Sequence, residues 1–148
     1  MTESQWAALS STERQLLICA LEGTSGLAWV DEVNENGEPV DLPAKVLSMV
    51  DRGWVTVHRI EPWTAPDGQK GIAYGPAIDR VALPEILADP ATWESLYSTL
   101  WYGAITLWPT EAGWVVSTTP GRGEAPAVPA PWVVPDWKIA DFERELGT

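Results

Sequence analysis

The sequence predicts a single α+β domain, because helix starts and strand-like segments alternate along the chain. Ser10 and Glu13 have the spacing at which a hydroxyl and a carboxylate satisfy unpaired N–H groups at a helix start. Residues 54–60 are rich in aromatic and β-branched side chains, which favours a strand. A chain of 148 residues suffices for one hydrophobic core and is too short for two. We therefore expect one domain over residues 1–119, followed by a Pro-rich segment and a short terminal helix over residues 120–148.

The first element is predicted to be a helix that begins at Ser10 and ends near Glu22. Its leucine and alanine residues recur on one face, and the glycine that follows supplies a left-handed stop. Residues 27–42 are then predicted to form a small hairpin or an ordered loop. The reason is the Asn36-Gly37 pair, which favours a tight reversal between short apolar runs.

A second helix is predicted over residues 42–52, directly before the strand over residues 54–60. Asp41 can cap this helix, and Pro43 suits its first turn, where no N–H group is needed. A turn-rich stretch follows the strand, and residues 71–74 are predicted to form a short return strand.

The second half of the chain is predicted to hold a helical turn over residues 84–88, a helix over 90–101, a strand over 105–108 and a last short helix that ends near residue 116. One face of the helix over 90–101 is entirely apolar and consists of Trp93, Leu96, Tyr97, Leu100 and Trp101. A face of this kind normally packs into a core. The alternative is an exposed docking surface, because tryptophan and tyrosine are frequent interface anchors.

The Pro-rich segment is predicted to be extended, because five prolines between residues 120 and 135 exclude a helix or a central strand. Trp132 and Trp137 bracket Pro135, and residues 136–146 are predicted to form an amphipathic helix. The two tryptophans favour an ordered strap, since exposed indoles in a solvated linker lower solubility. A free tail that engages another protein is the alternative.

Ten tryptophans against one phenylalanine and three tyrosines predict a core built from tryptophan. The single cysteine, Cys19, is expected to pack in the core and has no partner for an internal disulfide. The chain starts without a basic region and an apolar stretch of the export type, so we expect a cytoplasmic protein. The longest apolar run covers only residues 16–21, and a bilayer span needs about 20 residues. We therefore expect no membrane association.

Three segments together resemble the winged helix-turn-helix domain of small bacterial regulators. They are LLICALEG at residues 16–23, LSMVDRGWVTV at residues 47–57, and LWPTEAG at residues 107–113. The resemblance covers about residues 9–60 and 104–117, with residues 61–103 as a long insertion in the wing region. It implies a winged-helix-like α+β fold with the helix over residues 42–52 in the place of the DNA-reading helix.

The charge of the chain argues against nucleic acid as its main partner. Nine Lys and Arg stand against 21 Asp and Glu, a formal net charge of −12. A DNA-binding protein neutralises several phosphates, and this balance has the wrong sign for that task. The basic exception consists of Lys45, Arg52, His58 and Arg59, which are the DNA contacts expected under the resemblance.

The motifs of the common catalytic and metal sites do not occur. One cysteine and one histidine cannot supply a four-ligand structural zinc site. Residues 32–43 place Pro43 where a calcium loop needs a bidentate carboxylate. No phosphate-binding glycine loop or nucleophile elbow is found either. We therefore expect no enzyme activity, no catalytic residues, no metal and no cofactor.

The function predicted from the sequence is that of a non-catalytic, acidic protein-binding module or accessory regulator with a basic partner protein. The alternative is a sequence-specific DNA-binding transcriptional regulator that uses the helix over residues 42–52. The residues assigned to protein binding are the two tail tryptophans and three carboxylates of the acidic loop, namely Trp132, Trp137, Asp31, Glu32 and Glu35.

Overall fold

The computed structural model describes residues 5–22, 32–93, 102–117 and 127–137, together with Leu27, Val30 and Ile139. The helices in this part are α1 (Ser11–Glu22), α2 (Leu42–Asp51), α3 (Leu83–Ala88) and α4 (Glu111–Ser117). The strands are β1 (Val55–Thr64), β2 (Lys70–Tyr74), β3 (Ile105–Pro109) and β4 (Trp132–Val133). Three short 3₁₀ turns complete the described elements, η1 (Gln5–Ala8), η3 (Arg80–Ala82) and η4 (Pro90–Trp93). The mixed α+β class predicted from the sequence is confirmed.

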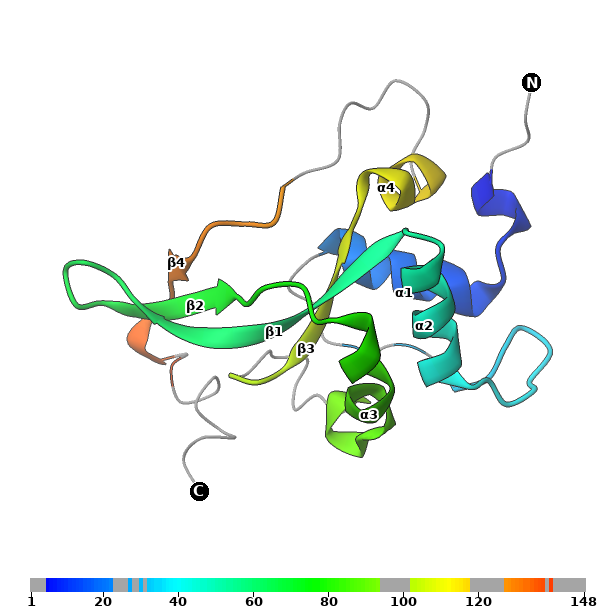
Figure 1. Ribbon diagram of the computed structural model, residues 1–148, viewed down its shortest axis with the longest axis horizontal. Helices are drawn as coiled ribbons and strands as arrows, with labels where there is room; N and C mark the ends of the chain where they lie inside the picture. Colours follow the sequence, from blue (N-terminus) through cyan, green and yellow to red (C-terminus); the bar gives the residue numbers. More distant parts are fainter. Residues whose placement is uncertain are drawn as a thin grey trace.

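The four strands form one sheet in the order β3-β1-β2-β4, and every neighbouring pair is antiparallel. Figure 1 shows α1, α2 and α3 together at one end of the molecule, while the β1–β2 hairpin reaches away from them. The short strand β4 lies beside this hairpin, on the outer side of β2 (Figure 1). The sheet therefore has a part that carries the helices and a part that carries the C-terminal segment.

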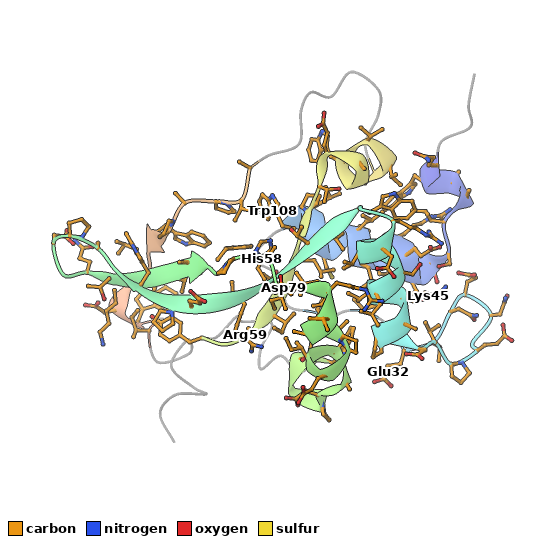
Figure 2. All side chains as sticks on the ribbon, in the orientation of Figure 1. Glu32, Lys45, His58, Arg59, Asp79 and Trp108 are labelled. Carbon is orange, nitrogen blue, oxygen red and sulfur yellow. The ribbon has the colours of Figure 1, made fainter. Side chains whose placement is uncertain are left out.

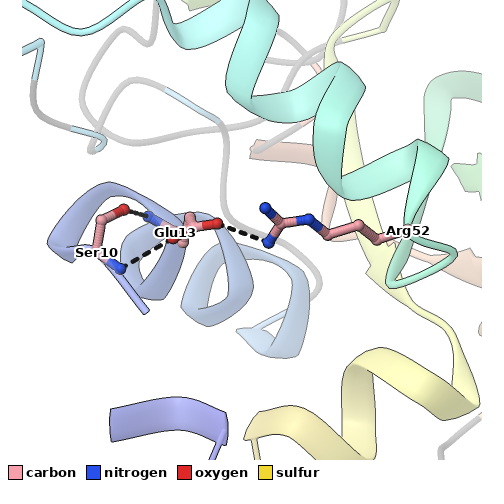
Figure 3. Close-up of polar contacts among 3 residues, drawn as sticks. All are labelled: Ser10, Glu13 and Arg52. Carbon is pink, nitrogen blue, oxygen red and sulfur yellow. Dashed lines mark hydrogen bonds and ion pairs between the residues drawn. The ribbon is translucent and has the colours of Figure 1, made fainter. Parts of the chain in front are cut away.

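The predicted starts of the first two helices are confirmed. At α1, the Glu13 N–H donates to Ser10 Oγ over 3.2 Å, and the Ser10 N–H donates to Glu13 Oε1 over 2.9 Å (Figure 3). At α2, the Asp41 carboxylate accepts from the Ala44 N–H over 3.1 Å, and Pro43 occupies the first turn. These local side-chain bonds satisfy donors that have no partner inside the helix.

The loop between α1 and α2 has the predicted reversal. The Asn34 N–H donates to the Glu38 carbonyl and the Gly37 N–H donates to the Asn34 carbonyl, both over 2.9 Å. Gly37 has a φ of 78°, which glycine adopts without strain. Residues 32–41 thus form a hairpin-like turn in which Val33 and Pro39 share an isolated β-bridge.

The main core is aliphatic, so the prediction of a core built from tryptophan is wrong for the described residues. Leu16 and Leu17 of α1, Val46 of α2, Val57 of β1 and Leu107 of β3 are fully or almost fully buried. The described tryptophans that touch this core lie at its rim and are only partly buried, namely Trp6, Trp54 and Trp93. An indole at the rim keeps its N–H near a hydrogen-bond acceptor, as at Trp93, whose Nε1–H donates to the Leu87 carbonyl over 2.9 Å.

A second, smaller core lies on the other face of the sheet. Its buried members are Ile60, Ile72, Tyr102, Ala104, Val134 and Ile139, and Tyr74 and Trp132 pack against it. Side chains of a strand alternate between the two faces, so β1 sends Val55 and Val57 to the main core and Ile60 to the second. The C-terminal segment contributes Val134, Ile139 and Trp132 to this second core.

Two predicted helices fall largely outside the described residues. The helix over residues 90–101 is described only at its start, where Pro90–Trp93 forms a 3₁₀ turn. The terminal helix over residues 136–146 is described only at residues 136, 137 and 139, whose backbone is helical.

Candidate functional site

One face of the sheet carries an aromatic ring from each of the four strands. His58 of β1 lies 5.8 Å from Tyr74 of β2, measured between ring centroids. The Tyr74 ring also meets Trp108 of β3 edge-on at 5.6 Å and Trp132 of β4 at 6.1 Å. These separations are those of rings in contact, so the other three rings each pack on Tyr74.

His58 is buried, with 4% of its surface exposed. Its Nδ1 lies 2.8 Å from the Gly75 carbonyl oxygen and its Nε2 lies 2.7 Å from Thr56 Oγ1. A carbonyl only accepts, so Nδ1 carries a proton and donates to Gly75. His58 therefore joins β1 to the residue that follows β2. Its ring lies inside the fold, whereas the sequence had assigned it to a surface in contact with DNA.

Tyr74 lies between the other three rings of this aromatic row, which consists of His58, Tyr74, Trp108 and Trp132. Its hydroxyl stays protonated near neutral pH. Burial raises the pKa of its hydroxyl to about 12, although a hydrogen bond with Thr106 lowers it in part. The row is therefore uncharged at Tyr74 and acts there as a packing surface.

The C-terminal segment lies on this part of the molecule as a strap, which we define as residues 127–137. Its strand β4 pairs with β2, with Gly71 opposite Val133 and Ile72 opposite Trp132. The Val134 N–H continues the ladder and donates to the Lys70 carbonyl over 3.1 Å.

The strap has an inner and an outer side. On the inner side, Trp132 is half-buried against Tyr74 and Val134 is buried. On the outer side, Val133 is 39% exposed, and Trp137, which follows Pro135, is 73% exposed. Of the two tryptophans predicted to bind a partner, Trp132 is thus half-buried and Trp137 is largely exposed.

One carboxylate of the acidic loop, Glu35, stabilises the start of α1. Glu35 accepts a hydrogen bond from the Ser11 N–H over 2.9 Å, and this bond lowers the pKa of the Glu35 carboxyl below 4.5. A carboxylate at this position also complements the positive end of the α1 dipole. Glu32 is exposed (Figure 2), and Asp31 lies outside the described residues.

The basic residues predicted for DNA binding do not form one patch. Arg52 is paired with Glu13 over 2.8 Å, and its guanidinium lies 4.8 Å from the centroid of the Trp54 ring. Arg59 donates to the Gly103 carbonyl over 3.1 Å. Figure 2 shows Lys45 on α2 and Arg59 on β1, at separate places on the molecule.

Glu13 should make the fold sensitive to acid. Burial alone would raise the pKa of its carboxyl, but hydrogen bonds from Ser10 and the charge of Arg52 lower the pKa below 4.5 overall (Figure 3). A group whose pKa is lowered by folding stabilises the protein above its unfolded pKa and loses this contribution as the pH falls through its folded pKa. We expect the urea midpoint to fall between about pH 6 and pH 3, and to fall less steeply in Glu13→Gln. Equal slopes in the two proteins would contradict this role of Glu13.

Three residues of the strap region escaped sequence reasoning. Gly71 and Tyr74 lie in a short return strand with no distinctive pattern, and Val133 lies between prolines. One signal in the sequence could have indicated the inner side of the strap. In an extended chain, Trp132 and Val134 lie on one side and Val133 lies on the other.

No helix in the described ranges is long and apolar enough to cross a membrane. Within the same residues, no three His, Cys, Asp or Glu side chains gather to hold a metal ion. Comparison with known proteins gives no matching family model, no matching curated protein and no matching solved structure.

Proposed function

We propose that this protein is a non-catalytic protein-binding module, and that the outer side of the strap is its binding surface. The observation that carries the proposal is the exposure of Trp137, which presents 73% of a large aromatic side chain to solvent. Val133 and Val128 are also exposed on the strap. A tryptophan on an ordered segment loses little freedom on binding, and tryptophan is the residue type most often found as an interface anchor.

The charge of the chain supports a basic partner. A net charge of −12 attracts cationic surfaces and steers their approach. Asp136 is exposed directly before Trp137, so an anionic group lies next to the apolar anchor. This combination suits a partner that offers an apolar pocket with Lys or Arg at its rim.

The winged-helix-like arrangement gives DNA binding less support. In that arrangement α2 would read the groove and the β1–β2 hairpin would be the wing. From residue 61 to 70 the hairpin carries two carboxylates, Glu61 and Asp67, against Lys70. Arg52 of the α2 end is already paired with Glu13. A surface that neutralises several phosphates needs more cations than these segments provide.

The proposal is tested by replacing Trp137 with alanine in the tagged full chain and measuring capture of partner proteins from the native host by quantitative cross-linking. We expect Trp137→Ala to lose at least about 2 kcal/mol of binding free energy, the range of an anchor residue, and so to lose most of the captured protein. Thermal unfolding of both chains is measured alongside, so that lost binding is distinguished from lost folding.

Val81→Ala is the matched control, because Val81 is 87% exposed and lies in η3 rather than on the strap. It should capture the same proteins as the natural sequence. Equal capture by Trp137→Ala and the natural chain would contradict the proposal. Tight, salt-sensitive binding of duplex DNA would favour the alternative instead.

A further inference from the structure

The outer edge of β2 already holds an added strand. Gly75 directly follows β2, and its N–H donates to the Arg59 carbonyl of β1 over 2.8 Å. The backbone groups of Gly75 therefore point at β1. Backbone groups alternate along a strand, so those of Lys70 and Ile72 point to the opposite edge. The Val134 N–H meets the Lys70 carbonyl there over 3.1 Å. The strap is thus bound in the way that a peptide adds to a sheet edge.

Side chains at alternate positions give this edge its selectivity. Trp132 lies against Tyr74, with ring centroids 6.1 Å apart, and Val134 is buried in the second core. Val133, between them, points outward and is not selected. In the strap, the edge thus holds an aromatic side chain followed, two positions later, by a β-branched one.

Gly71 lets the added strand come close. A Cβ at this position would collide with the backbone of Trp132 and Val133. The Gly71 carbonyl also accepts a hydrogen bond from the buried Tyr102 hydroxyl over 3.0 Å, which helps to hold β2 in place. The site therefore combines a strand edge, an aromatic contact, an aliphatic position and a glycine that admits backbone.

In the described part of the chain, the strap pairs with β2 through Trp132 and Val133 and adds one hydrogen bond, from the Val134 N–H to the Lys70 carbonyl. Pro131 and Pro135 lack the N–H groups that would lengthen the ladder. Its buried side chains belong to the second core and not to the main one. Release of the strap would therefore leave the main core intact.

We propose that the β2 edge is a strand-addition site for an extended peptide with the pattern aromatic, any residue, β-branched, and that the strap is its exchangeable internal occupant. Because the ligand is a segment of a partner protein, this inference rests on the proposed protein-binding function. The strand-addition site, however, lies on the inner side of the strap, and a separate measurement tests it. A partner segment without flanking prolines would pair along more of β2 and displace the strap.

The test uses a fluorescent synthetic peptide of residues 129–137 and the full chain with Val134→Asp, which weakens the inner contact of the strap. A site that is blocked in most molecules binds in proportion to its open fraction. Fluorescence anisotropy should therefore show binding to Val134→Asp at least about tenfold tighter than to the natural chain. The same peptide with Trp132→Ala and Val134→Ala should bind neither protein.

Equal affinity of the peptide for both chains, with the Val134→Asp strap shown to be cleavable by protease, would overturn the inference. Capture of partners through Trp137 would be unaffected by that result, so the two proposals can fail separately. If Val134→Asp does not fold, amide hydrogen exchange of the natural chain replaces it. The Ile72 amide, which faces the strap, should then exchange at least about tenfold faster than the Ala73 amide, which faces β1. Equal protection of the two amides would also overturn the inference.

Discussion

Replacing Gly113 with alanine should destabilise the protein by about 1–3 kcal/mol, the usual cost of adding a methyl group to a filled site. Alanine is ordinarily a better helix former than glycine by about 1 kcal/mol, so helix propensity alone would predict that Gly113→Ala stabilises the protein. We expect the opposite. The reason is the approach of α4 to the backbone before β1: a Cβ on Gly113 would collide with the Trp54 carbonyl oxygen. The measurement is the free energy of unfolding in urea.

The Thr110 hydroxyl ties α4 to the backbone before β1, so moving α4 away from Trp54 would strain these hydrogen bonds. The Thr110 hydroxyl donates to the Gly53 carbonyl and accepts from the Gly113 N–H over 3.1 Å. Ala112→Gly on the exposed side of α4 is the control, and it should lose only about 1 kcal/mol through helix propensity. An increase in stability for Gly113→Ala would show that α4 can move away from Trp54.

Replacing Gly71 with alanine should release the strap. The added Cβ would collide with the backbone of Trp132 and Val133, and β2 cannot retreat because β1 pairs with its other edge. The loss of the Val134 contact alone would cost about 1.5–3 kcal/mol, the value for exposing one large aliphatic side chain. The main core should remain folded, because the strap does not contribute to it.

Limited chymotrypsin digestion measures this release. Trp132 is half-buried in the sheet, so the rate of cleavage after it reports how often the strap leaves β2. We expect cleavage after Trp132 to become at least about tenfold faster in Gly71→Ala, in line with a shift of the local opening equilibrium. Ala73→Gly is the control, because it weakens β2 without adding atoms near the strap. Unchanged protection of Trp132 would mean that the strap adapts to the extra methyl group.

The elements that were predicted well depend on neighbouring residues alone. The Ser10–Glu13 pair and the Asp41 cap act within three residues, and both helix starts lie where the sequence places them. Strand β1 follows from its β-branched residues, although it runs to Thr64 and is longer than predicted. Local spacing is sufficient for such features because their hydrogen bonds form between nearby residues.

The features that could not be predicted depend on residues far apart in the chain. Strand β4 has two residues between prolines and exists because Gly71, far earlier in the chain, leaves room for it. The sequence identified Trp132 and Trp137 as candidate contacts but could not say that the first faces Tyr74 and the second faces solvent. Likewise, Glu35 was assigned to a partner surface, and its bond to the Ser11 N–H arises only when the loop folds back on α1.

The prolines on either side of β4 have a consequence for self-association. An uncovered β2 would expose a row of backbone donors and acceptors beside Ile72 and Tyr74, which is the kind of template on which chains stack into fibrils. A two-residue strand closed by Pro131 and Pro135 offers the next chain almost nothing to extend. The same segment therefore covers the β2 edge with a strand that is itself a poor template for a further chain.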